Sequence, residues 1–168
     1  MLRLILFRHG KAETTAPSGK DIDRALAARG ETDARLVGEA LFKAGYVPDL
    51  ALVSAARRTR ETWQAAQAVF PETRVEIVDA LYNAGSGLIL ALARDAEEPG
   101  TVMAVGHNPG VHEAAFRLAH GGEGDPAVMR GVGKGFPTAA AAVFRFEGGK
   151  PVAEAYFVPK DHGGGNEP

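Results

Sequence analysis

Three short segments of the sequence place cationic or imidazole side chains directly after an apolar run. Arg8 and His9 follow the first run, Arg58 lies just beyond the second, and His107 and Asn108 follow a later one. Burying an ionised group without a partner is costly, so such residues at strand ends are expected to face an anion. Arginines and helix N-terminal amides both suit a phosphate dianion. The sequence therefore predicts a phosphate site.

Helical phase distinguishes between two adjacent arginines after the second apolar run. Arg58, Thr62 and Val69 share one stripe of a helix, the side that should face the sheet. Arg57 lies about 100° away around the helix axis, which is typical of a solvated neighbour. We therefore expect Arg58 to be the residue in the pocket.

The elements that must position these residues alternate along the chain between short apolar runs and segments with helical spacing. The expected strands are residues 2–7, 50–54, 75–78 and 101–106, and the expected helices are residues 31–45, 55–70, 87–96 and 110–122. Residues 139–146 and 151–159 are expected to form a hairpin. This order predicts a three-layer α/β/α fold whose mostly parallel central sheet has an antiparallel edge. In such sheets ligands bind beyond the carboxyl ends of the strands, where the three segments would meet.

Length and composition limit the possible classes of protein. The 168 residues suit a single domain, expected over residues 1–159, with a disordered tail at 160–168. A net charge of −2 gives no reason to expect binding to nucleic acid or to a membrane. The chain has no cysteine, which excludes disulfides and thiolate metal sites. The apolar run before Arg8 is too short for a signal peptide, so we expect a cytoplasmic protein. The oligomeric state stays open.

Several motifs together resemble a known family. They are "RHG" after the first strand, Ser54 with Arg58 and Thr62 in an S-x-x-x-R-x-x-x-T pattern, and a late "GH" after an apolar strand. These motifs resemble the histidine phosphatase superfamily, over about residues 2–158. The small size and the segments "ALYNAG", "VGHNPG" and "FPTAAAAVF" are most similar to its phosphohistidine phosphatases of the SixA type. The resemblance implies a phosphoglycerate mutase-like fold.

The resemblance also implies a covalent mechanism without a metal or another cofactor. His9 would be the nucleophile that attacks phosphorus, and Arg8, Arg58 and His107 would hold the phosphoryl oxygens. Elementary chemistry agrees, because a histidine attacks only through an unprotonated nitrogen and nearby arginines disfavour its cationic form. The same arginines would stabilise the charge of the transition state.

One departure from the family pattern bears on the substrate. Larger members that cleave phosphate esters carry a glutamate proton donor soon after the third strand, whereas this chain has no acid between Asp79 and Asp95. An alkoxide needs a general acid, but a phosphorylated imidazole can be protonated on its other nitrogen and leave neutral. The sequence therefore favours protein phosphohistidine as the substrate. Asp79 or Glu13 remains open as a proton donor.

Two other functions remain open at this point. The first is a phosphatase of the same mechanism that acts on a small phosphorylated metabolite. The second is a catalytically silent module that binds phosphate or a phosphoprotein. The presence of both His9 and His107 argues against the silent module, since arginines alone could bind the anion.

Other candidates have structural interpretations. Asn108 is either a phosphate contact or a helix cap, and Arg24 either borders the site or is solvated. His112, His120 and His162 are expected to be structural. The Gly-rich stretch 121–135 is expected to be a flexible loop or lid. It is not a nucleotide-binding loop of the G-x-x-x-x-G-K-[ST] type, because the required positions hold Val128 and Gly135.

Overall fold

The computed structural model describes residues 1–165. The strands are β1 (Arg3–Arg8), β2 (Leu50–Ser54), β3 (Arg74–Val78), β4 (Thr101–Gly106), β5 (Glu123–Gly124), β6 (Ala141–Glu147) and β7 (Lys150–Phe157). The α-helices are α1 (Ala28–Lys43), α2 (Arg57–Ala66), α3 (Ser86–Asp95), α4 (Gly110–Gly121) and α5 (Pro126–Lys134). Short 3-10 helices are η1 (Asp21–Asp23), η2 (Gln67–Val69), η3 (Asp79–Leu81) and η4 (Pro159–His162).

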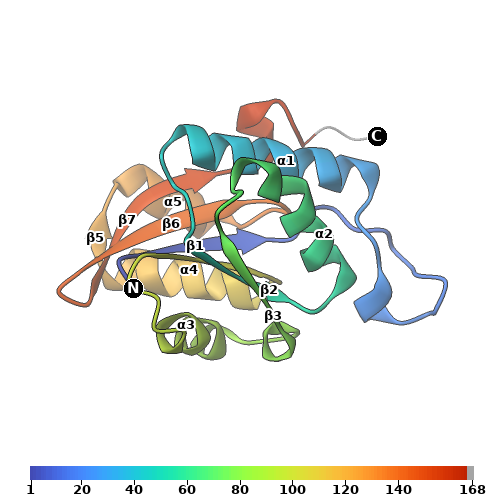
Figure 1. The fold of residues 1–168 in the computed structure, drawn as a ribbon. Coiled ribbons are helices and arrows are strands. Elements are labelled where there is room, and N and C mark those ends of the chain that lie inside the picture. The colour runs from blue at the N-terminus through green and yellow to red at the C-terminus, as the bar shows by residue number, and fades with distance from the viewer. Residues whose placement is uncertain (166–168) are drawn as a thin grey trace.

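The strands form one sheet in the order β3-β2-β4-β1-β6-β7-β5. The pairs β1–β4, β2–β4 and β2–β3 are parallel, whereas β6 runs antiparallel to both β1 and β7. Helices α1 and α2 cover one face of this sheet, and α3, α4 and α5 cover the other (Figure 1). The predicted three-layer α/β/α fold with a mostly parallel sheet is confirmed.

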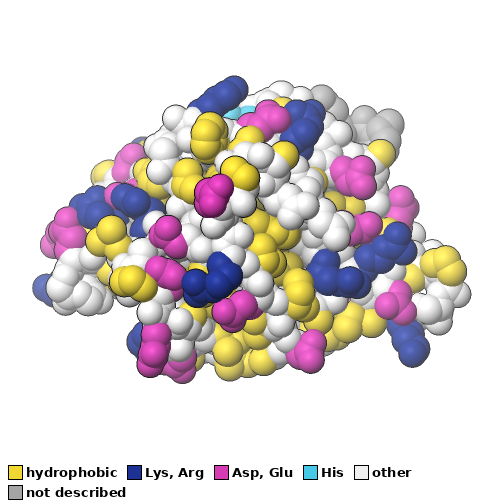
Figure 2. Space-filling model, in the orientation of Figure 1, with side chains coloured by type: hydrophobic (Ala, Val, Ile, Leu, Met, Phe, Trp, Pro, Cys, Tyr) yellow, Lys and Arg dark blue, Asp and Glu magenta, His cyan; other side chains and the backbone are white. Residues whose placement is uncertain are grey.

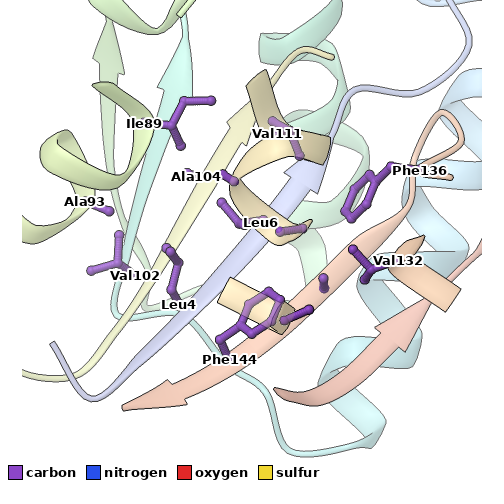
Figure 3. Packing of buried hydrophobic residues seen from close by; sticks show 14 of the residues in the cluster. Leu4, Leu6, Ile89, Ala93, Val102, Ala104, Val111, Val132, Phe136 and Phe144 are labelled. Carbon is purple, nitrogen blue, oxygen red and sulfur yellow. The ribbon is translucent and has the colours of Figure 1, made fainter. Parts of the chain in front are cut away.

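Strand β1 shows how the central sheet is buried on both faces. Leu4 and Leu6 pack into the core on the α4 side, which Figure 3 shows from close by, whereas Ile5 and Phe7 pack against α1 and α2. All four side chains are fully buried. Burying each such side chain stabilises the fold by roughly 1.5–3 kcal/mol. The central strand is thereby held firmly, and with it the residues that follow its carboxyl end.

The stretch at 121–135 differs from the prediction, because most of it is helical. Asp125 caps α5, and its carboxylate accepts a hydrogen bond of 2.8 Å from the backbone N–H of Ala127. Pro126 occupies the first turn, where its missing N–H removes nothing. Val128 and Val132 are buried on the inner face of the helix. The expectation of a flexible loop is therefore wrong for residues 126–134.

The C-terminal segment also differs from the prediction. The 3-10 helix η4 begins at Pro159, and the N–H of Gly165 donates a hydrogen bond of 2.8 Å to the carboxylate of Asp33 on α1. The expectation of a disordered tail is wrong for residues 160–165, because these contacts dock the segment on α1. Residues 166–168 lie outside the described residues.

The outer surface mixes charges of both signs. On the face seen in Figure 2, basic and acidic side chains lie side by side over its described part, in agreement with the small net charge. Within residues 1–165, no helix has the length and apolar character needed to cross a membrane.

Candidate active site

The parallel pairing of β1 with β4 brings two histidines together. Arg8 lies opposite Gly106 in the register, and the N–H of His9 donates to the carbonyl of Gly106 over 3.1 Å. His107 follows directly, so the ring centroids of His9 and His107 are 5.4 Å apart. The sheet therefore places both rings at its carboxyl edge, as the strand order requires.

The ring of His9 is held in one protonation state. Its Nδ1 lies 2.7 Å from the carbonyl oxygen of Gly10, and because a carbonyl only accepts, Nδ1 carries the proton. Burial lowers the pKa of His9 to about 3; the bond to Gly10 opposes this shift, and the charges of His107, Arg58 and Arg8 add to it. His9 is therefore neutral at pH 7, with an unprotonated Nε2.

Gly10 allows this arrangement because its backbone is closely packed. A Cβ at this position would lie 2.5 Å from the carbonyl oxygen of Gly30 in α1. The N–H of Gly10 donates a hydrogen bond of 3.0 Å to the hydroxyl of Thr62, which itself donates to the carbonyl of Arg58. The glycine after His9 is thus required by the close approach of α1 and by its link to α2.

Arg58 lies on the buried side of α2, and its neighbour does not. The Arg58 side chain is 7% exposed, whereas Arg57 is 49% exposed and forms an ion pair with Glu61. The Nη1 of Arg58 donates to the backbone carbonyl of Asp21 (2.9 Å), and its Nη2 donates to the carboxylate of Asp21 (3.1 Å). Its Nε is buried and has no hydrogen-bond partner. The N–H at Nε of Arg58 therefore has no acceptor among the described residues.

Arg8 is held in a similar way at the end of β1. Its Nη1 donates a hydrogen bond of 2.9 Å to the carbonyl oxygen of Phe136, just beyond α5, whereas its Nε is buried without a partner. Burial lowers the pKa of the Arg8 guanidinium from its ordinary value. The fold thus holds a partly desolvated cation without a carboxylate beside it.

His107 presents a further unpartnered nitrogen. Its Nε2 lies 2.7 Å from the hydroxyl of Ser54 at the end of β2, and its Nδ1 is buried without a partner. Burial lowers the pKa of His107 to about 4, with further lowering by Arg58. If the Ser54 hydroxyl donates to Nε2, the proton of the neutral ring lies on Nδ1. Nδ1 is then a hydrogen-bond donor.

These side chains share a feature that is rare in folded proteins. Nearly all buried polar atoms have hydrogen-bond partners, yet five side-chain atoms of the described residues have none: Arg8 Nε, Arg24 Nε, Arg58 Nε, Trp63 Nε1 and His107 Nδ1. Three of them, on Arg8, Arg58 and His107, belong to residues around His9, whereas Trp63 lies in the core. Such a set of open donors can hold the oxygens of an anion next to an unprotonated imidazole nitrogen.

Both the nitrogen and the oxygen of the Asn108 side-chain amide form hydrogen bonds within the protein. Its Nδ2 donates a hydrogen bond of 2.9 Å to the carbonyl of Phe136, and its Oδ1 accepts one of 3.2 Å from the backbone N–H of His112. These contacts favour the helix-cap interpretation of Asn108. A direct contact between Asn108 and substrate stays a prediction.

The other histidines contact the backbone or aromatic rings elsewhere. A ring nitrogen of His112 lies 2.8 Å from the carbonyl of Val132, one of His120 lies 3.0 Å from that of Phe116, and the His162 ring stacks near Phe157. Among the residues that the structure describes, no group of three or more His, Asp or Glu side chains is placed to hold a metal ion.

Sequence reasoning missed two residues at the rim of the site. The carboxylate of Asp21 in η1 contacts Arg58, and the hydroxyl of Tyr82 donates to the same carboxylate over 2.6 Å. The Tyr82 ring lies 5.6 Å from that of His107. Arg24, left open between two interpretations, lies 3.5 Å from Asp21 and so borders the site. Tyr82 lies within the family-like segment "ALYNAG", but no spacing or periodicity in the sequence indicates that it meets Asp21.

Asp79 and Glu13, both left open as proton donors, lie apart from this cluster. Asp79 is in η3 and Glu13 is exposed in the loop after β1. Between described residues, no hydrogen bond or ion pair joins either carboxylate to Arg8, His9 or His107.

Comparison with known proteins agrees with the geometry. The profile of the Histidine phosphatase superfamily (branch 1) matches residues 4–99, more than half of the chain. A chloroplastic protein of Arabidopsis thaliana is 36% identical over 133 residues, which are 70% of this chain and 59% of that protein. The chain thus spans less than two thirds of that relative. A protein of Mycobacterium tuberculosis is 34% identical over 143 residues, 84% of this chain and 87% of its own length.

A solved structure supports the same assignment. A protein from Agrobacterium tumefaciens, described as a phosphohistidine phosphatase SixA, superposes with a TM-score of 0.76 and 34% sequence identity. The superposition covers 86% of this chain and 91% of that one. The chain belongs to the histidine phosphatase superfamily and is similar to its SixA-type members.

Proposed function

We propose that the protein is a phosphatase that transfers a phosphoryl group from its substrate to Nε2 of His9 and then to water. The observation that carries this proposal is the unprotonated Nε2 of His9, beside three buried donors that have no partner within residues 1–165. An anion in the pocket would satisfy these donors, which otherwise remain desolvated at a cost of about 1–3 kcal/mol each.

The two steps follow from the protonation state of His9. The lone pair of Nε2 forms a bond to phosphorus while the bond to the leaving group breaks and its electron pair departs with that group. The proton on Nδ1 stays hydrogen-bonded to the Gly10 carbonyl, so the phosphorylated ring is cationic and becomes a good leaving group. Water then attacks phosphorus, and His9 leaves as the neutral imidazole that began the cycle.

Arg8, Arg58 and His107 would bind the three equatorial oxygens and stabilise their charge in both steps. Two fixed guanidinium groups supply the positive charge that other phosphoryl-transfer enzymes obtain from metal ions. We therefore propose that the activity needs no metal, and that it persists at full rate after dialysis against a chelator.

Protein phosphohistidine is the proposed substrate, and the cytoplasm is the proposed location. Between described residues, neither Asp79 nor Glu13 forms a hydrogen bond or ion pair with Arg8, His9 or His107, so no carboxylic acid is held there to protonate an alkoxide leaving group. An imidazole leaving group needs none at the reacting nitrogen. The description of the similar Agrobacterium protein as a phosphohistidine phosphatase supports this choice.

The test is release of inorganic phosphate from a phosphohistidine peptide and from an aryl phosphate. Wild-type protein should turn over the peptide, and His9→Ala should lower turnover by on the order of 10⁴-fold or more, as removal of a nucleophile does. His120→Ala is the matched control, because that ring contacts only its own helix. Quenching in alkaline denaturant, in which a phosphorus–nitrogen bond is stable, should trap the phosphoryl group on wild-type protein but not on His9→Ala.

The other outcomes separate the alternatives. Cleavage of the aryl phosphate alone would keep the chemistry and reject phosphohistidine in favour of a small phosphorylated metabolite. Saturable phosphate binding without turnover would indicate a silent binding module. Unimpaired turnover by His9→Ala would reject the mechanism.

A further inference from the structure

Asp21 is an unexpected residue to find beside a phosphate pocket. Its carboxylate contacts Arg58 Nη2 at 3.1 Å, accepts the Tyr82 hydroxyl at 2.6 Å and lies 3.5 Å from Arg24 Nε. A negative charge so close to Arg58 weakens the attraction of that arginine for a phosphate dianion. If the pocket only bound phosphate, this carboxylate would be a disadvantage, which indicates that it takes part in the chemistry.

The position of Asp21 limits what it can touch. Its side chain is 50% exposed, whereas His9, Arg58 and His107 are buried. In phosphoryl transfer the leaving group departs on the side of phosphorus opposite to the nucleophile. Since His9 is at the buried floor, the leaving group must lie toward the open rim. Asp21 and Tyr82 belong to that rim.

A phosphohistidine substrate makes the reaction a transfer between two imidazoles. Each ring is a neutral leaving group only when its far nitrogen carries a proton. On the enzyme side, the Gly10 carbonyl holds the proton on Nδ1 of His9. On the substrate side, the same task requires an acceptor at the rim, and an anionic acceptor is best because it favours the protonated ring.

We infer that Asp21 is the acceptor that holds the proton on the far nitrogen of the departing substrate imidazole, and that it makes the site selective for phosphohistidine. This inference rests on the function proposed above. As the phosphorus–nitrogen bond breaks, its electron pair returns to the near nitrogen of the substrate ring. The far N–H stays hydrogen-bonded to Asp21, so the imidazole leaves neutral and no proton needs to be delivered.

The surroundings of Asp21 keep it suited to accept rather than to donate. The hydrogen bond from Tyr82, together with Arg58, lowers the pKa of Asp21 below its ordinary value. An ionised carboxylate cannot protonate an alkoxide, so the same residue gives no help with phosphate esters. Tyr82 and Arg58 thus act as positioning residues that fix the orientation of the carboxylate.

Asp21→Asn separates this role from simple support of Arg58. The backbone carbonyl of Asp21 still accepts from Arg58 Nη1, and the new amide oxygen can still accept from Tyr82. The negative charge is removed, and the amide nitrogen takes the place of Oδ1, which lies 3.5 Å from Arg24 Nε. Asp23→Asn is the matched control, because Asp23 lies in the same 3-10 helix, and its carboxylate accepts a hydrogen bond from the hydroxyl of Ser18.

The experiment measures kcat and KM for a phosphohistidine peptide and an aryl phosphate, together with inhibition by inorganic phosphate. For Asp21→Asn we expect kcat/KM on the peptide to fall between roughly 10- and 100-fold, the effect of losing a charged hydrogen bond. The aryl phosphate should lose no activity, and inorganic phosphate should bind roughly two- to fivefold more tightly, because a half-exposed negative charge has gone. Asp23→Asn should behave as wild type.

A parallel loss on both substrates would overturn the inference, since it would show that Asp21 merely holds Arg58. An unchanged peptide rate would overturn it as well. Failure of the proposed function looks different: wild-type protein would then cleave only the aryl phosphate, or His9→Ala would remain active, and either result is seen before any Asp21 variant is compared.

Discussion

The two ends of β1 carry arginines in opposite circumstances. Arg3 at the start forms an ion pair with Glu154, with 2.7 Å between Arg3 Nε and the carboxylate, and this hydrogen bond raises the pKa of Arg3. Arg8 at the end of the strand donates only to the Phe136 carbonyl and keeps a buried Nε without a partner, and burial lowers its pKa. The two arginines lie at opposite ends of one six-residue strand, and only the first is neutralised by a carboxylate.

The difference separates charge that stabilises the fold from charge that serves a ligand. At the start of β1, Arg3 and Arg145 share the carboxylate of Glu154, so the ionised groups there satisfy one another. At the carboxyl end of β1, by contrast, the buried Nε of Arg8 has no hydrogen-bond partner among the described residues. Natural sequences accept such violations mainly at functional sites.

The largest effect is expected for Arg8→Gln. Losing a donor to the phosphoryl oxygens should lower kcat/KM by on the order of 10²–10³-fold. The free energy of unfolding should stay unchanged or rise, because a desolvated cation is removed. Steady-state kinetics and urea denaturation on the same preparation measure both. A large loss of stability would show that Arg8 is structural, and the contrast between the two ends would fail.

Acid sensitivity should come mainly from the site end of the sheet. The pKa values of His9 and His107 lie near 3 and 4 in the folded protein and near 6.5 when unfolded, so the unfolded chain binds more protons below pH 6.5. Stability is therefore fully present above pH 6.5 and falls with acidification, by up to about 1.4 kcal/mol per pH unit for each histidine. Urea denaturation between pH 7 and pH 5 should show this slope.

The control for this slope is His107→Gln, which should remove about half of it. Glu154 should not contribute in that window. Burial acts to raise its pKa, but the hydrogen bonds from Arg3 and Arg145 lower it below its ordinary 4.5. Its stabilisation is present above pH 4.5 and is lost only as the pH falls through its lowered pKa. An acid slope that persists in variants of both site histidines would contradict this assignment.

The smallest effect is expected for Arg3→Gln, the counterpart of Arg8→Gln on the same strand. Removing one partner of the half-buried Glu154 should lower the free energy of unfolding by about 1–2 kcal/mol, because Arg145 still pairs with the carboxylate. The activity should match that of wild type. If Arg3→Gln loses activity as strongly as Arg8→Gln, the two ends of the strand do not differ in the way described.

The residues that surround the reacting nitrogen could be predicted from the sequence, whereas the contact between the two residues at the rim could not. Arg8, His9 and His107 directly follow apolar strands, so their meeting at one edge follows from the parallel fold. Asp21 and Tyr82 are 61 residues apart and meet only through tertiary contacts. A backbone carbonyl such as that of Phe136 carries no side-chain signal at all.

The prediction of a flexible loop at residues 121–135 was wrong because it rested on the glycine content of that stretch. The stretch contains several glycines, and this suggested a loop, but the Asp125-Pro126 pair is a helix start that outweighs them. Val128 and Val132 then bury one face of the helix, and tertiary packing overrides weak propensity. The C-terminal segment was misjudged for a related reason, since its contact with Asp33 is invisible in a local pattern.

The carbonyl oxygen of Phe136 receives hydrogen bonds from both Arg8 and Asn108, so one backbone atom fastens β1, the start of α4 and the end of α5 to one another. Helix α5 therefore contributes to the pocket through its length rather than through its side chains. Each residue inserted or deleted in α5 would shift this carbonyl by about 1.5 Å along the helix axis. A change in the number of residues in α5 would therefore move this carbonyl away from Arg8 and Asn108.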